Sequence, residues 1–167
     1  FDINDAVTVE AVELFQPDLI LAPFLKRAIP EIIWRNHTCL IVHPGIIGDR
    51  GPSALDWAIM RGHRQWGVTV LQANAEMDAG DIWATETFPM RFTSKSDLYR
   101  QEVVEAATAA VLTAIHRFQS GTFKPAPLDY SRSDVHGRLH APMRQIDRRI
   151  DWQKDNTHTI LTKIHAA

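Results

Sequence analysis

The sequence predicts an α/β protein with a mostly parallel sheet. Short, continuously apolar runs of strand length recur along the chain, segments with helical spacing separate them, and glycine or proline marks the joins. The runs typical of buried strands are residues 18–22, 39–43 and 68–71. Strands separated by helices usually pair in parallel through right-handed crossovers, so this alternation favours a layered α/β sheet.

The amino-terminal part is expected to begin with a helix. Asn4 or Asp5 can cap a helix over residues 6–15. After the first strand, residues 23–25 break the extended run, and a loosely helical segment over 30–34 leads into the second strand.

The stretch from the second strand to Asp81 holds the main functional signal. His43 ends that strand at its carboxyl end, where open α/β sheets place ligands. A helix over 53–61 follows, and Asp78 comes just after the third strand, so two acid/base groups far apart in the sequence can meet in space. Glycines lie in the connecting loops, where backbone turns sharply or approaches a ligand: Gly45, Gly48, Gly51 and Gly80.

Two interpretations of His43 and Asp78 remain open from the residues alone. The functional one is an acid/base pair, in which a histidine that titrates near neutrality is oriented by a carboxylate and stabilises or protonates an oxyanion. The structural one is a satisfied histidine at a strand end and an aspartate that caps a loop. The surrounding glycines favour the functional interpretation.

The carboxyl-terminal half is expected to add an edge and a long helix. Residues 82–88 form a hairpin partner or edge strand. A helix over 94–119 is opened by a Ser94–Asp97 capping box and closed by Gly121.

A proline-rich segment over 124–127 is typical of a linker. The polar stretch 129–167 shows only a short helical pattern, over 157–164. We therefore divide the chain into a domain over residues 1–124 and a linker with the beginning of a carboxyl-terminal region over residues 125–167.

Composition limits the classes of partner. The chain has 167 residues, 45% of them hydrophobic, and a formal net charge of −2, which gives no electrostatic basis for binding nucleic acid. No run is apolar for long enough to cross a membrane. The single cysteine, Cys39, is expected to be a buried apolar side chain, and this cysteine usage favours the cytoplasm. A start at Phe1 rather than methionine predicts a fragment of a longer protein.

Other chemistries have weak signals. No histidine or cysteine spacing is typical of a metal site, the glycine-rich loop matches no nucleotide-binding pattern, and Ser53 lacks a nucleophile elbow. Arg50 is expected either to hold an anionic ligand or to pair with Asp49 or Asp56.

Several segments together resemble the folate-dependent formyltransferase family, which includes methionyl-tRNA, glycinamide ribonucleotide and amino-sugar formyltransferases. They are His43-Pro44, Arg50-Gly51-Pro52, Trp57-Ala58-Ile59, Gly67-Val68-Thr69-Val70, Met77-Asp78-Ala79-Gly80-Asp81-Ile82 and Ile150-Asp151-Trp152. The resemblance covers nearly the whole chain and implies a Rossmann-like formyltransferase fold whose first strands precede Phe1. The amino-acid sequence around His43, over 71–77 and over 128–131 is most similar to that of members that act in hydrogenase maturation.

The resemblance also implies a site. The catalytic histidine and aspartate of the family fall on His43 and Asp78, with His43 acting on the formyl oxyanion and Asp78 orienting His43 and moving protons through water. The family's asparagine falls on Ile41, which cannot donate a hydrogen bond. The pterin of formyl-tetrahydrofolate is expected to lie near residues 23–25 and the loop before Asp78. The candidates for folate binding are therefore Pro23, Phe24, Leu25, Gln72, Met77 and Gly80.

For the hydrogenase-maturation members, the resemblance implies that the formyl group passes to coenzyme A and becomes the carbon monoxide ligand of nickel-iron hydrogenase. That second step belongs to an enoyl-CoA-hydratase-like module that lies outside this sequence, and the hydrogenase maturation machinery is a further expected partner. Two alternatives remain: a formyltetrahydrofolate hydrolase or amino-sugar formyltransferase, and a folate-binding module without activity. The replacement at Ile41 counts against an amine as acceptor.

Overall fold

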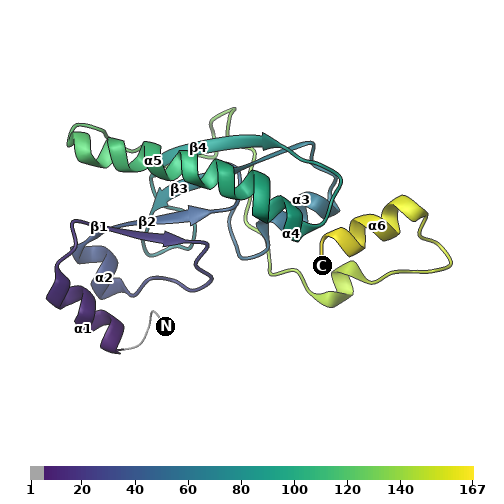
Figure 1. The fold of residues 1–167 in the computed structure, drawn as a ribbon, viewed down its shortest axis with the longest axis horizontal. Helices are drawn as coiled ribbons and strands as arrows, with labels where there is room; N and C mark the ends of the chain where they lie inside the picture. Colours follow the sequence, from purple (N-terminus) through teal and green to yellow (C-terminus); the bar gives the residue numbers. More distant parts are fainter. Residues whose placement is uncertain (1–5) are drawn as a thin grey trace.

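A computed structural model describes residues 6–167, and it is built around one four-stranded sheet (Figure 1). The strands are adjacent in chain order: β1 (Leu19–Pro23), β2 (Thr38–His43), β3 (Gln65–Gln72) and β4 (Ile82–Pro89). The expected strands are therefore present, and the α/β class predicted from the sequence is confirmed. The proposed caps Asn4 and Asp5 lie outside the described residues.

The sheet is mixed. β1 and β2 pair in parallel, but β2 and β3 pair antiparallel, with His43 opposite Thr69, and β3 and β4 form an antiparallel hairpin. The expected parallel crossover between β2 and β3 is therefore wrong. The helix between them has 7 residues and a length of about 10 Å, whereas the 6 residues of β2 span about 20 Å, so the chain re-enters the sheet at the end that it left.

Two hydrophobic clusters cover the two faces of the sheet. The alternation along β2 assigns Leu40 and Val42 to one cluster and Cys39 to the other. The helix α5 (Val104–Ser120) packs on β3 and β4 through buried alanines, and α2 (Glu31–Asn36) packs on β2 with α1 (Ala6–Phe15) behind it. Cys39 is 1% exposed, and burial raises the pKa of its thiol to about 11, so the expectation of a buried apolar cysteine is confirmed.

The long helix that follows β4 changes its helix type along its length. It begins as α4 (Lys95–Leu98), passes through a π-helical turn over Tyr99–Val103, and continues as α5. The Ser94 hydroxyl accepts a hydrogen bond from the Asp97 N–H at 3.2 Å, which is the N-cap half of the predicted capping box, and Gly121 ends the helix with φ of 64°.

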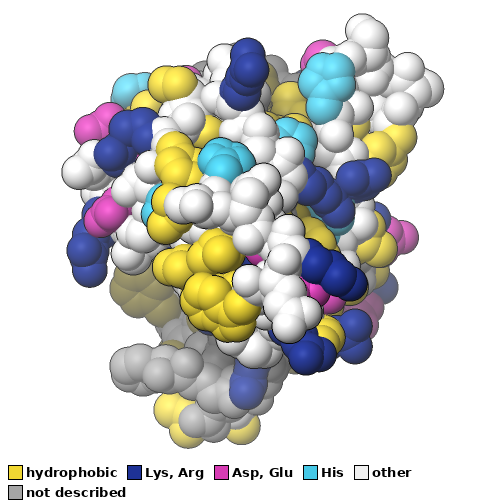
Figure 2. Space-filling model, turned by 90° about the vertical axis from the view of Figure 1, so that its right-hand side faces the viewer, with side chains coloured by type: hydrophobic (Ala, Val, Ile, Leu, Met, Phe, Trp, Pro, Cys, Tyr) yellow, Lys and Arg dark blue, Asp and Glu magenta, His cyan; other side chains and the backbone are white. Residues whose placement is uncertain are grey.

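The segment after α5 returns across the molecule instead of extending away from it. Ala126 pairs with Ile82, and Leu139 pairs with Arg50 in a parallel bridge. A 3-10 turn over Gln145–Arg148 and the helix α6 (Thr157–His165) then lie beside α3 (Ala54–Met60). Figure 2 shows this end of the molecule, where histidine, lysine and arginine side chains lie among small groups of hydrophobic ones.

The helices of the structure bear on whether this chain could cross a membrane. Within residues 6–167, every helix is too short or too polar to span a bilayer.

Candidate active site

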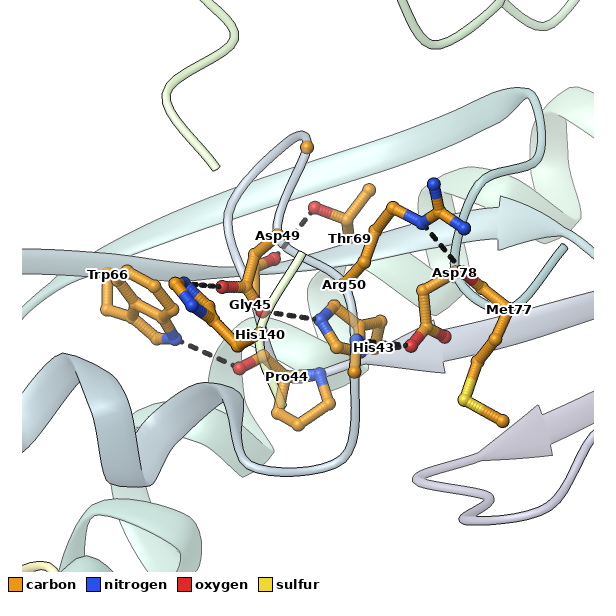
Figure 3. A network of polar contacts seen from close by, with 12 residues as sticks. His43, Pro44, Gly45, Asp49, Arg50, Trp66, Thr69, Met77, Asp78 and His140 are labelled. Carbon is orange, nitrogen blue, oxygen red and sulfur yellow. Dashed lines mark hydrogen bonds and ion pairs between the residues drawn. The ribbon is translucent and has the colours of Figure 1, made fainter. Parts of the chain in front are cut away.

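The candidate site forms where β2 ends and two loops meet (Figure 3). β2 delivers His43, the loop that follows delivers Asp49, and the loop after β3 delivers Asp78. All three side chains are buried, with exposed fractions of 5%, 1% and 7%. The two groups predicted to meet, His43 and Asp78, are thus brought together.

The imidazole of His43 lies between two carboxylates. Its Nε2 is 2.8 Å from Oδ2 of Asp49, within hydrogen-bond distance, and its Nδ1 is 3.5 Å from Oδ2 of Asp78, at ion-pair distance. A proton on either ring nitrogen therefore faces an acceptor. The shorter contact is to Asp49, which the sequence did not single out.

The loop over residues 44–53 is held against β3. Thr69 donates a hydrogen bond from Oγ1 to the carbonyl of Gly45 at 2.8 Å, and Trp66 donates from Nε1 to the carbonyl of Pro44 at 2.9 Å. A Cβ at Gly45 would lie 2.5 Å from Nε2 of His43, so the backbone here packs directly on the imidazole.

Asp78 is fixed by its own backbone and by a glycine. Its φ is 53°, a left-handed conformation that aspartate and asparagine adopt more readily than most residues. The N–H of Gly51 donates to its Oδ2 at 3.1 Å.

The guanidinium of Arg50 donates to the carbonyl of Met77 at 2.9 Å and to Glu76 at 3.1 Å, so the expected pairing of Arg50 with Asp49 or Asp56 is wrong.

A cavity of about 360 Å³ opens beside His43 and Asp78. Of the residues proposed for folate binding, Phe24, Leu25 and Met77 line it. Ile41 lines it too and presents only an alkyl side chain. Besides His43 and Asp78, its charged and polar lining consists of residues that the sequence did not assign to a folate site: Lys26, Ser53, Asp56, Lys95 and Tyr99.

The other three candidates do not line the cavity. Pro23 is the last residue of β1, and its side chain does not line the cavity. Gln72 accepts a hydrogen bond from Nε1 of Trp83 at 3.2 Å, and Gly80 packs on the Gln72 backbone. Gln72 and Gly80 therefore support the loop that carries Met77 and Asp78, and their role toward a ligand stays a prediction.

Tyr99 reaches the cavity from the π-helical turn. Its ring meets that of Phe24 edge-on, with centroids 5.8 Å apart. Burial, with a smaller effect of the negative charge of Asp56, raises the pKa of the Tyr99 phenol to about 12. The phenol is therefore a neutral donor and acceptor at physiological pH.

A second buried histidine stands behind Asp49. His140 Nε2 is 3.5 Å from Oδ1 of Asp49 and 2.9 Å from Nη1 of Arg61. Burial, followed by the positive charge of Arg61, lowers the pKa of His140, so the neutral imidazole is favoured near neutral pH. Periodicity gave no signal for His140, because it lies in an irregular segment 91 residues after Asp49 in the sequence.

Comparison with known proteins identifies the family. The sequence matches the family Formyl transferase over residues 3–115. The chain belongs to this family. The family membership predicted from the sequence is confirmed.

Among formyl transferase relatives, the hydrogenase maturation factor HoxX of Bradyrhizobium diazoefficiens is 53% identical over 99% of this chain. A methionyl-tRNA formyltransferase of Chloroflexus aurantiacus is 28% identical over 90% of the chain. The chain spans 29% of the first relative and 48% of the second. The predicted similarity to hydrogenase-maturation proteins is confirmed.

Solved structures agree with this fold. HypX from Aquifex aeolicus in complex with tetrahydrofolic acid superimposes with a TM-score of 0.91 at 52% identity, over 99% of this chain and 28% of that one. Methionyl-tRNA formyltransferase from Clostridium thermocellum superimposes with a TM-score of 0.74 at 21% identity, over 97% of this chain and 67% of that one. The formyltransferase fold predicted from the sequence is confirmed.

Proposed function

We propose that this chain carries out the folate half-reaction of a formyl transfer in hydrogenase maturation, with formyl-tetrahydrofolate as the donor. The observation that carries the proposal is the buried His43, held between two carboxylates at the wall of a cavity with apolar side chains. The relative HypX is described in complex with tetrahydrofolic acid, and it is 52% identical to this chain.

In the proposed chemistry, His43 and Asp78 each have a role in moving the formyl group off the folate. A nucleophile adds to the formyl carbon, the formyl oxygen becomes an oxyanion, and the bond to the folate nitrogen breaks as that nitrogen takes up a proton. His43 lies at the cavity wall, where it can stabilise the oxyanion and exchange a proton. Asp78 borders the same cavity 3.5 Å from Nδ1, close enough to stabilise a positive imidazole and to accept a proton from water.

Folate would be held mainly by shape and apolar contact. Phe24, Leu25 and Met77 offer apolar surface for a planar ring, and a pocket with a few convergent polar groups is typical of small-molecule sites. Pro23, Gln72 and Gly80 contribute backbone support in this proposal. Ile41 leaves the oxyanion one donor short of the family pattern, and losing such a donor typically costs about a hundredfold in rate.

The later steps belong to the longer protein. We propose that the formyl group passes to coenzyme A and becomes the carbon monoxide ligand of nickel-iron hydrogenase, in contact with the maturation machinery in the cytoplasm. The proposal keeps the division at residue 124, with the formyltransferase-type domain before it. The family match ending at residue 115 and the end of α5 at Ser120 support this division.

Hydrolysis is the second candidate. His43 and Asp78 both border the cavity, so the same pair can activate water and release formate. Transfer to an amino sugar has less support because Ile41 provides no amide at the oxyanion. A folate-binding module without activity is the remaining outcome of the test.

The test measures tetrahydrofolate release from formyl-tetrahydrofolate by the complete protein, with and without coenzyme A, beside Asp78→Asn. Asparagine tolerates the left-handed backbone at position 78, so the substitution removes the charge and leaves the loop in place. We expect release that depends on coenzyme A and falls about a hundredfold or more in Asp78→Asn.

Asp81→Asn is the matched control, because Asp81 is an exposed acid in the same loop. Release that ignores coenzyme A would support the hydrolase. Binding of folate without release would leave only the binding module, and undiminished release by Asp78→Asn would remove Asp78 from the chemistry.

A further inference from the structure

Asp49 is a buried acid that the proposed chemistry does not use. Its side chain has no exposed surface and does not line the cavity, so it cannot touch a substrate there. Its Oδ2 nevertheless makes the shorter of the two carboxylate contacts of His43, 2.8 Å to Nε2 against 3.5 Å from Nδ1 to Asp78. Of the two residues assigned to the chemistry, Asp49 contacts only His43, so it can act only through that histidine.

The second oxygen of Asp49 has no hydrogen-bond donor among the described residues. Oδ1 lies 3.5 Å from Nε2 of His140, but Arg61 donates to that nitrogen at 2.9 Å. The lowered pKa of His140, caused by burial and then by the charge of Arg61, fits an imidazole that accepts this hydrogen bond. A buried carboxylate with one side-chain hydrogen bond is costly, which makes its bond to His43 the feature that needs an explanation.

The fold fixes Asp49 from the carboxyl-terminal side. Gly137 packs so closely that a Cβ there would lie 1.8 Å from the Asp49 nitrogen. Backbone hydrogen bonds join residues 137–140 to the loop: Gly137 N–H to the Ile47 carbonyl at 2.9 Å, Arg50 N–H to the Arg138 carbonyl at 3.2 Å, and His140 N–H to the Arg50 carbonyl at 2.9 Å. Asp49 therefore has little freedom to leave His43.

We propose that Asp49 is the positioning residue of this site, fixing a hydrogen on Nε2 of His43 so that Nδ1 is the nitrogen that exchanges protons in the cavity. In the same proposal, residues 137–140 belong to the active site as the support of Asp49. The proposal rests on the proposed function for its kinetic part only, since the position of the hydrogen on His43 is a property of the protein itself.

The chemistry follows from the two nitrogens. An ionised carboxylate at Nε2 can only accept, so the neutral imidazole carries its hydrogen on Nε2 and leaves the Nδ1 lone pair toward Asp78 and the cavity. When Nδ1 takes up a proton, the charge of Asp49 stabilises the resulting imidazolium. An amide at position 49 can donate as well as accept, and it therefore no longer selects one tautomer.

The experiment combines histidine nitrogen NMR with kinetics in the complete protein, labelled with nitrogen-15 in its histidines. The signals of His43 are assigned by their loss in His43→Gln. In the unsubstituted protein we expect the neutral form to carry its hydrogen on Nε2. In Asp49→Asn we expect a mixture of tautomers and a fall in kcat for tetrahydrofolate release of about a hundredfold or more, with KM for the folate little changed.

Asp134→Asn serves as the matched control, because Asp134 is an exposed acid of the carboxyl-terminal segment that pairs with Arg132. A hydrogen on Nδ1 of His43 in the unsubstituted protein would overturn the proposal, even if Asp49→Asn did not fold. An Asp49→Asn enzyme with unchanged kcat, or with reduced kcat but an unchanged tautomer, would also overturn it. If the unsubstituted protein releases no tetrahydrofolate, the proposed function fails while the tautomer measurement still decides the role of Asp49.

Discussion

Unusual backbone conformations lie directly at the cavity wall. Phe24 and Asp78 both have φ of 53°, and both line the cavity. Left-handed backbone is costly for a bulky residue such as phenylalanine, and it persists only where surrounding contacts hold it. The edge contact of Phe24 with Tyr99 and the bond from Gly51 to Asp78 provide such contacts.

A side chain at position 80 is predicted to destabilise the fold through a steric clash alone. The φ of Gly80 lies outside the positive range, but a Cβ would sit 1.7 Å from the carbonyl oxygen of Gln72. Gly80→Ala must therefore push the loop that carries Asp78 away from β3. We expect a loss of about 1–3 kcal/mol in the free energy of unfolding, measured by denaturant titration, together with reduced tetrahydrofolate release.

Gly121→Ala provides the comparison, because Gly121 has φ of 64° and open space where a Cβ would point. Its cost arises from conformation and should be about 1 kcal/mol, with no effect on release. Equal activity in Gly80→Ala and Gly121→Ala would contradict the steric argument.

At the scale of elements, the sequence predicted what local patterns control. The helix α1 matches its expected bounds, and the strands appear where the apolar runs lie. The π-helical turn over Tyr99–Val103 was not predicted, because apolar periodicity does not distinguish one wider turn within a helix. That turn matters for the site, since Tyr99 lines the cavity.

Asp56 connects three further elements to α3. Its Oδ1 accepts from Nζ of Lys95 at 3.1 Å and from Nη1 of Arg148 at 3.2 Å, and Arg148 also donates to the carbonyl of Ala166 at 2.6 Å. Asp56→Asn leaves two neighbouring cations without a counter-charge. We expect a loss of about 1.5–3 kcal/mol in stability and faster amide hydrogen exchange in α6.

A surface pair controls for the removal of a charge. Glu31 and Arg35 form an i,i+4 pair in α2 with both side chains largely exposed. Glu31→Gln should change the free energy of unfolding by less than about 0.5 kcal/mol. If Asp56→Asn costs no more than Glu31→Gln, the contacts of Asp56 do not hold α6 in place.

For the molecule as a whole, the sequence predicted the family and brought His43 and Asp78 together, but it did not predict how the chain closes on itself. Asp49 and Gly137 are in contact although 88 residues separate them. The segment that carries Gly137 is polar and irregular, so neither periodicity nor a turn pattern indicates its partner. The antiparallel return into β3 escaped prediction for a similar reason, because it depends on the length of a loop and a short helix rather than on a local pattern.

This closure predicts how stability depends on pH. Burial and then Arg61 lower the pKa of His140 below its ordinary value of 6.5, with Arg138 and His63 acting in the same direction and Asp49 opposing them. Below pH 6.5 the unfolded chain therefore binds a proton at this histidine that the folded chain binds only at lower pH. Because the unfolded state holds more protons in that window, the free energy of unfolding falls as pH decreases.

We expect the midpoint of urea unfolding to decrease between pH 7 and pH 5.5, with a contribution from His140 of at most about 1.4 kcal/mol per pH unit. His140→Gln should flatten this dependence, because glutamine does not titrate. His136→Gln, an exposed position four residues earlier, controls for the removal of a histidine from this segment. A His140→Gln chain that loses stability with acid as steeply as the unsubstituted chain would show that the packing of His140 behind Asp49 does not cause the pH dependence.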